Sequence, residues 1–327
     1  RNHQTTEERA TPPPPVRVSG RLATVDLGTN AVRLLVVEPD GAGWRTLHQT
    51  QRVTRLGEGQ GPAGRLAAEP MRRTAATVTE FARAARALGA VRVRIVATSA
   101  VREAANRAEF VARLEGESAE RVEVVSGEEE ARLTLKGVTS GLPGLGPAFV
   151  LFDIGGGSTE FVLARHGAPA AAVSLRLGVV RLQEEWGEPG PVRWDRFAAL
   201  RRHVEARLAA EVPEEIAGLR EGELVGTAGT VTTLAALDLG LEVYDASRVH
   251  GHRLTRAVVE RELARLGALD VAARARLGCL EPGRADVIIP GIAICLATMT
   301  RFRRETLRVS DRGLREGILC ELLEAAA

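Results

Sequence analysis

The stretch "FVLFDIGGGSTEFVLAR", residues 149–165, joins two runs of β-forming apolar residues through a glycine-rich turn. An ordinary β-hairpin needs one or two glycines at its turn, so the third has no evident structural purpose. A turn without Cβ atoms lets consecutive backbone N–H groups point into one concavity that binds phosphate oxygens, and neighbouring hydroxyls add donors. The predicted phosphate ligands in this turn are Gly155, Gly156, Gly157, Ser158 and Thr159.

A second turn of the same kind occurs in "VDLGTNAVRLLVV", residues 25–37, where Gly28, Thr29 and Asn30 follow a strand-like run. In each copy an aspartate stands two residues before the first glycine. A carboxylate beside bound phosphate repels it unless a cation lies between them, and Mg²⁺ is commonly held by one or two carboxylates with water and phosphate. The alternative is an ordinary hairpin with a solvated aspartate, which two matching copies disfavour. The predicted Mg²⁺ ligands are Asp26, Asp153 and Glu160.

The order of predicted elements indicates an α/β fold built twice. Three strands are followed by a helix over about 70–88, a strand, a helix over about 99–114, a short strand and a helix opening at residue 126, which is βββαβαβα. Glycines and a proline at 139–148 mark a boundary, after which three strands begin again. We expect a disordered tail over 1–20 and two similar domains, 21–142 and 143–327, that face one cleft.

Composition limits the partners of the 327-residue chain. Lys and Arg number 44 against 42 Asp and Glu, and aromatic residues make up 3%, so neither a basic field nor stacking platforms indicate nucleic acid. Three cysteines without C-x-x-C spacing predict no disulfide framework or zinc site and suit a reducing cytoplasm. The longest apolar run, residues 287–299, contains a proline and is too short to span a membrane.

Other strand-to-helix junctions are further candidate anion sites. Gly229 and Thr230 lie at one such junction, and Thr98 and Ser99 lie at another, where helix N-termini direct N–H groups outward. Helix capping is the structural alternative at both. Arg284 is either a phosphate ligand or the ion-pair partner of Asp286 or Asp311.

The segment "SGEEEA", residues 126–131, carries the candidate base. Ser126 and Glu129 match the S-x-x-E capping box, which gives Glu129 a structural role. Glu128 suits the first turn of a helix as a solvated acid. Glu130 is left without a structural role, and a carboxylate at the edge of a cleft can orient and deprotonate water.

Together these segments resemble the exopolyphosphatase/guanosine pentaphosphate phosphohydrolase family, a branch of the actin, heat-shock chaperone ATPase and sugar kinase superfamily. The motifs are "DLGTNAVRLLV", "ATSAVREAANRAEF", "VVSGEEEARLTLKGV", "FDIGGGSTEFV", "GTAGTVTTLAAL", "GRADVIIPG" and "VSDRGLREGIL", in the family's order. The resemblance implies two ribonuclease-H-like (actin-like ATPase) domains with the active site in the cleft between them. It also implies that the last helix, after Arg315, packs back onto the first domain.

For the site, the resemblance implies hydrolysis of a terminal phosphoanhydride with magnesium. Glu130 matches the family's catalytic glutamate, Asp153 and Glu160 its acidic positions, and Gly155 to Ser158 its phosphate cradle. Arg33 and Arg102 occupy positions where family members contact the polyanion. Longer members carry an additional C-terminal helical domain that does not follow here. The resemblance therefore leaves open whether the substrate is polyphosphate or guanosine pentaphosphate.

The predicted function is therefore a cytoplasmic exopolyphosphatase in which Glu130 activates water. The alternatives are a guanosine pentaphosphate (pppGpp) phosphohydrolase with the same site, a nucleotide-switched actin-like filament protein, and a polyphosphate sensor without activity. Inorganic polyphosphate or guanosine pentaphosphate is the expected partner, with no nucleic acid and no membrane, and a homodimer is left open.

Overall fold

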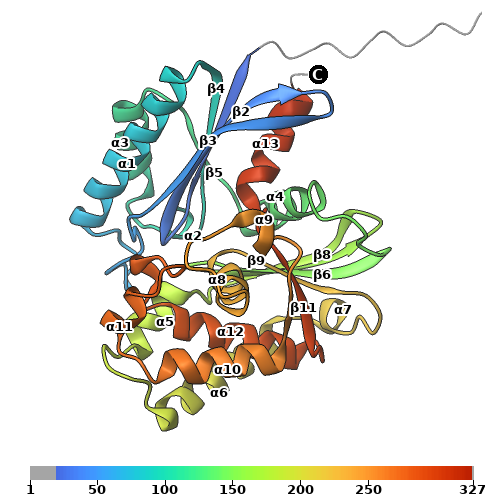
Figure 1. The fold of residues 1–327 in the computed structure, drawn as a ribbon. Helices are drawn as coiled ribbons and strands as arrows, with labels where there is room; N and C mark the ends of the chain where they lie inside the picture. Colours follow the sequence, from blue (N-terminus) through green and yellow to red (C-terminus); the bar gives the residue numbers. More distant parts are fainter. Residues whose placement is uncertain (1–19, 326–327) are drawn as a thin grey trace, which may run out of the picture.

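The computed structural model describes residues 20–325, which form two α/β lobes, one above the other in Figure 1. The tail predicted over 1–20 lies, except for Gly20, outside the described residues. The first lobe contains a five-stranded sheet in the order β3-β2-β1-β4-β5, with helices α1 and α3 packed on one face. Its elements are β1 (Arg21–Leu27), β2 (Ala31–Asp40), β3 (Gly43–Val53), α1 (Ala68–Ala87), β4 (Ala90–Ala97), α2 (Ser99–Arg102), α3 (Arg107–Ser118) and β5 (Val122–Val124).

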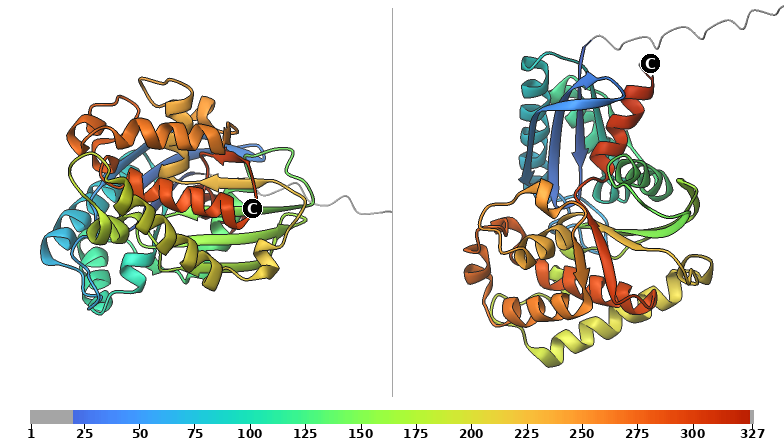
Figure 2. Two further views of the ribbon diagram at one scale, coloured as in Figure 1. Left: turned by 90° about the horizontal axis from the view of Figure 1, so that it is seen from below. Right: turned by 45° about the vertical axis from the view of Figure 1, so that its right-hand side comes forward.

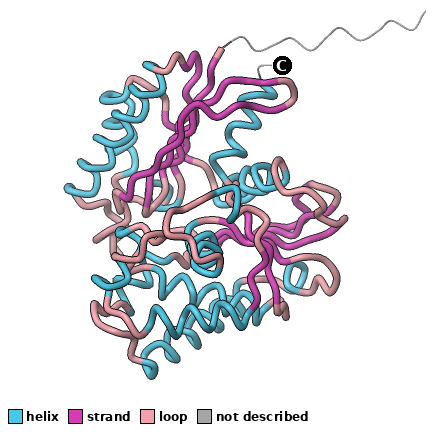
Figure 3. The backbone as a smooth tube through the Cα atoms, viewed as in Figure 1, coloured by secondary structure: helices cyan, strands magenta, loops and turns pink. Residues whose placement is uncertain are grey.

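The second lobe contains a six-stranded sheet in the order β10-β11-β9-β6-β7-β8. Starting from β8, five of these strands repeat the connectivity and strand directions of the first sheet, and β10 is added antiparallel to β11. Figure 3 shows the two sheets as separate groups of strands. The strands are β6 (Ala148–Ile154), β7 (Thr159–Arg165), β8 (Ala168–Leu175), β9 (Leu224–Thr227), β10 (Arg253–Thr255) and β11 (Thr306–Ser310).

The predicted fold class, two ribonuclease-H-like domains around a cleft, is confirmed, but the second half is not a plain βββαβαβα unit. More helices than such a unit contains stand between its strands. Of these, α5, α6, α10 and α12 cover the face of the second sheet that lies away from the first lobe, whereas the carbonyl of Gly283 accepts from Arg55 of the first lobe. The helices between the strands are α5 (Val179–Trp186), α6 (Trp194–Glu211), α7 (Glu214–Ala217), α8 (Gly229–Asp238), α9 (Ala246–Val249), α10 (Arg256–Gly267), α11 (Val271–Ala275), the 3₁₀ turn η1 (Pro282–Arg284) and α12 (Ile288–Arg301).

The single helix predicted over 99–114 is wrong, because the chain forms α2 and α3 with a break between them. Asn106 precedes α3, and both ends of its amide bind the backbone of Leu66, with Oδ1 accepting from N at 2.9 Å and Nδ2 donating to O at 3.1 Å. Asparagine side chains compete with the helical backbone for such hydrogen bonds. The break therefore anchors the loop before α1.

Two helices are exchanged between the lobes. α4 (Gly127–Thr139) follows the first sheet, yet Leu135 and Val138 pack against Phe149 and other residues of the second sheet. α13 (Leu314–Ala325) follows the second sheet, yet it packs against β1 and β2 of the first, where Leu319 and Leu322 join the apolar cluster. Figures 1 and 2 show α13 beside the first sheet.

α4 and α13 meet at glycines. A Cβ atom on Gly137 would lie 1.9 Å from the carbonyl oxygen of Gly313, and one on Gly317 would lie 1.8 Å from that of Leu133. Because these neighbours are backbone atoms, no side chain can move aside, and the crossing requires glycine. Within residues 20–325, no helix is long and apolar enough to cross a lipid bilayer.

Candidate active site

The two glycine-rich turns face each other at the cleft between the lobes. Each is closed by the same hydrogen bond, from Gly28 N to Ala31 O at 3.0 Å and from Gly155 N to Ser158 O at 2.8 Å. A Cβ atom on Gly156 would lie 3.0 Å from the backbone N of Asn30. On Gly157 it would lie 2.7 Å from the hydroxyl of Thr29 and 2.6 Å from that of Ser99. The extra glycine therefore leaves room for the opposite lobe.

These turns border one cleft that opens to solvent. Most of the residues predicted from the sequence line it, so segments far apart in the chain converge on one place. The lining residues among the candidates are Asp26, Gly28, Thr29, Asn30, Arg33, Thr98, Ser99, Glu130, Asp153, Gly155, Gly156, Gly157, Ser158, Gly229, Thr230 and Arg284.

Two buried donors in the cleft have no hydrogen-bond partner among the described residues. They are Nδ2 of Asn30 and the hydroxyl of Ser99. The Asn30 amide is oriented by Arg55, whose Nε donates to Oδ1 at 3.3 Å, so the NH₂ end remains unpaired. Unpaired buried donors cost roughly 1–3 kcal/mol each and are rare in folded proteins. Acceptor oxygens of a ligand in the cleft would satisfy both.

Three predicted site residues do not line the cleft. The buried hydroxyl of Thr159 donates to the carbonyl of Leu177 at 2.6 Å, because the side chain alternates away from the turn at the start of β7. Arg102 donates to Glu130 at 2.9 Å and to the carbonyl of Val125 at 3.0 Å. Its geometry makes it a partner of Glu130 in this structure.

Glu160 is the third, and it is nearly fully buried, with Ser174 donating to Oε1 at 2.6 Å. In the sheet it pairs with Asp153, just as Arg33 pairs with Asp26 in the first lobe. The duplicated position therefore carries opposite charges in the two lobes. Arg33 lowers the pKa of both aspartates, although burial has the larger effect on each.

Four carboxylates share this region, three of them buried and that of Asp153 half-buried. Burial, opposed by Arg33 and assisted by the nearby Asp153, raises the pKa of Asp26 to about 6. Burial and then Asp153 raise the pKa of Glu160 to about 7. The pKa of Glu130 is raised well above its usual range by burial and then by Glu160. Clusters of carboxylates with raised pKa values are common at functional sites.

Glu130 stands in the first turn of α4 with its side chain in the cleft. The N-cap is Ser126, whose hydroxyl accepts from the N–H of Glu129 at 3.1 Å. This hydrogen bond is one of the two that make up the predicted capping box. The other, from the N–H of Ser126 to the Glu129 carboxylate, is replaced by the hydrogen bonds that Arg132 donates to this carboxylate at 2.6 and 2.9 Å. Glu130 is 7% exposed, and Arg102 donates to its Oε2. This hydrogen bond fixes the orientation of the carboxylate in the cleft.

The cleft fits magnesium better than a metal bound wholly by side chains. Within the described residues, no group of three or more His, Cys, Asp or Glu is close enough to enclose a metal ion. Mg²⁺ needs only one or two carboxylates when water and phosphate complete its shell. Asp26 and Asp153 line the cleft and could supply them, and the raised pKa of Asp26 reflects a site where a cation would be stabilising.

The start of α8 adds a backbone site on the second lobe. Ala228 has φ of 75° and ψ of −175°, a combination almost restricted to glycine, and such strain clusters at ligand-binding sites. A Cβ atom on Gly229 would lie 2.0 Å from Nη1 of Arg284, so the guanidinium lies directly over this turn. Arg284 pairs with Glu281 at 3.2 Å and with neither predicted partner.

The cleft continues past Arg33 and Arg284 into a second open region. Both arginines line the two spaces, and Arg315 and Tyr244 line only the second. Asp311 is also present there and binds the Tyr244 hydroxyl. The positive side chains therefore form a path that leads away from Glu130.

Sequence reasoning missed three residues of the site. Arg55 orients Asn30 and connects the lobes, Ser174 binds Glu160, and Ala228 adopts the strained turn. A signal existed only for Ser174, which is a polar residue in the otherwise apolar strand run "PAAAVSL". The roles of the other two depend on contacts made across the fold.

Comparisons with known proteins identify relatives over nearly the whole chain. The model of the Ppx/GppA phosphatase family matches residues 35–326. Exopolyphosphatase 2 of Mycobacterium tuberculosis (strain ATCC 25618 / H37Rv) is 38% identical over 323 residues, covering 92% of this chain and 98% of the relative. Guanosine-5'-triphosphate,3'-diphosphate pyrophosphatase of Aeromonas salmonicida is 30% identical over 302 residues, covering 92% of this chain and 59% of the relative.

Solved structures agree. An exopolyphosphatase from Cytophaga hutchinsonii superimposes with a TM-score of 0.86 at 26% identity, covering 93% of this chain and 98% of that one. The Aquifex aeolicus member of the Ppx/GppA family superimposes with a TM-score of 0.78 at 31% identity, with coverages of 93% and 98%. The match in sequence, fold and glycine-rich turns leads to one conclusion: the chain belongs to the Ppx/GppA phosphatase family.

Proposed function

We propose that the protein is an exopolyphosphatase, which hydrolyses the terminal phosphoanhydride of inorganic polyphosphate and releases orthophosphate. The observation that carries this proposal is Glu130, a buried carboxylate held by Arg102 in a cleft whose walls are phosphate-binding turns. A carboxylate aimed at water suits hydrolysis and would be wasteful in a kinase. The relatives named exopolyphosphatase, matched over nearly their full length, support the same assignment.

In the proposed reaction, the terminal phosphate lies between the two turns, where the N–H groups of Gly156 and Gly157, the Asn30 amide and the Ser99 hydroxyl contact its oxygens. Glu130 accepts a proton from water as the water oxygen attacks phosphorus. The anhydride bond breaks, and its electron pair remains on the bridging oxygen of the shortened chain. The next phosphates follow Arg33 and Arg284 out of the cleft. Mg²⁺ held by Asp26 and Asp153 would neutralise phosphate charge.

The same site could accept guanosine pentaphosphate, whose 5′ end also presents a terminal phosphoanhydride. The 30% identity to the Aeromonas enzyme makes this the second candidate. The structure offers few platforms for a guanine ring, since the second region contains one aromatic residue, Tyr244, bound to Asp311. Polyphosphate is therefore the preferred substrate in our proposal, and a cytoplasmic location suits the three cysteines, which are unpaired in the structure.

The test is phosphate release from long-chain polyphosphate, tripolyphosphate, guanosine pentaphosphate and ATP, with Mg²⁺ and with a chelator. Glu130→Gln should lower kcat for the preferred substrate by roughly 10²- to 10⁴-fold, because a general base typically contributes that much. Glu128→Gln is the matched control, since Glu128 is exposed in the same helical turn and should leave turnover unchanged. Normal turnover by a folded Glu130→Gln variant would refute the assigned base.

A further inference from the structure

The second region beyond Arg33 and Arg284 has more positive charge than its acidic residues balance. Its volume is about 400 Å³, within the range of small-molecule sites. Three arginines and two carboxylates line it. Both carboxylates already have partners, since Glu281 accepts from Arg284 at 3.2 Å and Asp311 accepts from the Tyr244 hydroxyl. The surplus of donors and positive charge therefore suits an anion.

Arg33 and Arg284 form the entrance to this region from the cleft, and their like charges are close together. Burial and then Arg33 lower the pKa of Arg284, and Glu281 opposes this effect. Two guanidinium groups that repel each other inside a fold are stabilised when an anion bridges them. A phosphate at this entrance would supply that charge.

Arg315 adds a third positive charge from α13, the helix that the second half of the chain contributes to the first lobe. Its Nη1 lies 3.5 Å from the carbonyl oxygen of Leu34, which follows Arg33 in β2. Its Nε and Nη2 donate to Oε1 of Glu316 at 3.1 and 3.0 Å. Glu316 is 6% exposed, and its Oε2 accepts from the N–H of Gly313 at 2.8 Å. The orientation of the Arg315 guanidinium is therefore fixed before any ligand binds.

The residues that line the two spaces give an order along the path. Arg33 and Arg284 line both the cleft and the second region, whereas Arg315 lines the second region only. A chain with its terminal phosphate beside Glu130 would therefore reach Arg315 after the first two arginines. The Arg315 side chain is 14% exposed, and its Nη1 contact with Leu34 is at the limit of a hydrogen bond. The Nη1–H groups are thus available to a ligand.

We propose that Arg315 binds the third phosphate, counted from the end that is hydrolysed, and makes the enzyme select chains of three or more phosphates over pyrophosphate. This inference rests on the proposed function, because the terminal phosphate beside Glu130 sets the direction of the chain. A guanidinium whose orientation is already fixed loses little conformational entropy when it binds phosphate. Pyrophosphate ends before Arg315 and gains no affinity from it.

The test is calorimetric titration of the full chain, in buffer with Mg²⁺, with imidodiphosphate and with diimidotriphosphate. In these ligands N–H groups replace the bridging oxygens of the anhydride, so neither is hydrolysed. The wild type should bind diimidotriphosphate at least about 10-fold more tightly than imidodiphosphate. Arg315→Met should weaken binding of diimidotriphosphate roughly 10- to 100-fold and change that of imidodiphosphate less than about twofold. Arg248→Met is the matched control, because Arg248 is exposed in α9 and does not line the region.

A second variant covers the case in which Arg315→Met fails to fold. Gln49 lines the same region from β3 and is exposed, so Gln49→Glu adds a negative charge with almost no change in shape. It should weaken diimidotriphosphate binding roughly 2- to 5-fold and leave imidodiphosphate binding unchanged. Unchanged diimidotriphosphate affinity in Gln49→Glu, or equal loss or no loss of the two ligands in folded Arg315→Met, overturns the inference. Binding of neither ligand to the wild type contradicts the proposed function as well, whereas selective loss without any polyphosphate turnover contradicts only the proposed hydrolysis.

Discussion

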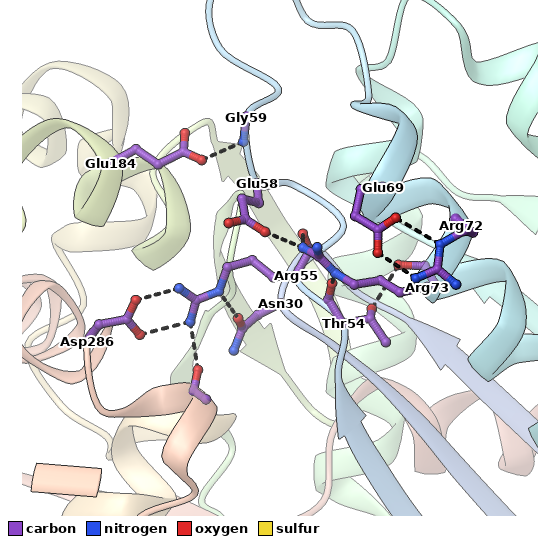
Figure 4. Close-up of polar contacts among 12 residues, drawn as sticks. Asn30, Thr54, Arg55, Glu58, Gly59, Glu69, Arg72, Arg73, Glu184 and Asp286 are labelled. Carbon is purple, nitrogen blue, oxygen red and sulfur yellow. Dashed lines mark hydrogen bonds and ion pairs between the residues drawn. The ribbon is translucent and has the colours of Figure 1, made fainter. Parts of the chain in front are cut away.

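Replacing Arg55 by methionine should weaken substrate binding, although this residue lies outside the predicted site. Arg55 donates to both carboxylate oxygens of Asp286 and to the carbonyl of Gly283, which belong to the second lobe (Figure 4). Its Nε holds the Asn30 amide that lines the cleft. One side chain thus joins the lobes and orients a phosphate donor.

The size of the effect follows from partial burial. The side chains of Arg55 and Asp286 are 20% and 25% exposed, so their interaction is shielded better than that of a surface ion pair. Hydrogen bonds to charged groups contribute about 1.5–3 kcal/mol, and the remaining exposure favours the lower part of that range. A loss of about 1.5–2.5 kcal/mol corresponds to a KM raised roughly 10- to 70-fold. We expect kcat to change much less, because Asn30 and the closed lobes act on bound substrate and transition state alike.

The assay is steady-state phosphate release from polyphosphate by Arg55→Met, Asp286→Asn and the double variant. A coupling free energy above about 0.5 kcal/mol in this cycle is expected for residues in direct contact. Arg72→Met is the control, since Arg72 binds Glu69 within the first lobe only, and both side chains are exposed. A KM within twofold of the wild type for Arg55→Met, or strictly additive effects, would refute the reasoning.

Three further predictions concern packing, the base and the acidic cluster. Gly137→Ala should destabilise the protein by at least about 1–3 kcal/mol, because the added methyl group meets backbone of the other exchanged segment, and thermal unfolding measures this. Gly146→Ala, with nothing near its Cβ position, should leave the melting temperature unchanged. Arg102→Met removes a group that lowers the pKa of Glu130, so the acid limb of the pH profile of kcat/KM should move to higher pH. An unmoved limb would mean that Glu130 is not the titrating base. Burial raises the pKa of Asp26 from 3.8 to about 6, so the folded state binds more protons than the unfolded chain in that interval. The metal-free protein should therefore lose stability as pH rises from about 4 to 6, and Mg²⁺ should restore it; a melting temperature that rises through this window without metal would contradict the assignment.

Local patterns predicted most of the fold because they were repeated. The matching turns at Asp26 and Asp153 indicated duplication, and the two sheets share strand order and directions. The helices α9, α10 and α11 of the second lobe were not predicted, although Asp245, Thr255 and Asp270 cap them, because a duplicated βββαβαβα pattern has no place for them. The break at Asn106 depends on a loop forty residues earlier, which no local window contains.

The site was predictable where chemistry belongs to a motif and unpredictable where it depends on pairing across the fold. The glycine turns and Glu130 were found because residue type and spacing carry their chemistry. Thr159 was misplaced because strand alternation turns its hydroxyl inward to Leu177. Arg55 was missed because its partners in the second lobe, Gly283 and Asp286, are more than two hundred positions away.

The exchange of α4 and α13 has a consequence for how the protein can be divided. Each lobe is completed by a helix from the other half of the chain, as in a domain-swapped dimer whose two subunits have been fused. A fragment that ends after β5 would present the apolar side chains of Leu22, Leu35 and Val37 to water, because Leu319 and Leu322 cover them in the intact chain. Neither lobe is therefore an autonomous folding unit, and the two should melt in a single cooperative transition.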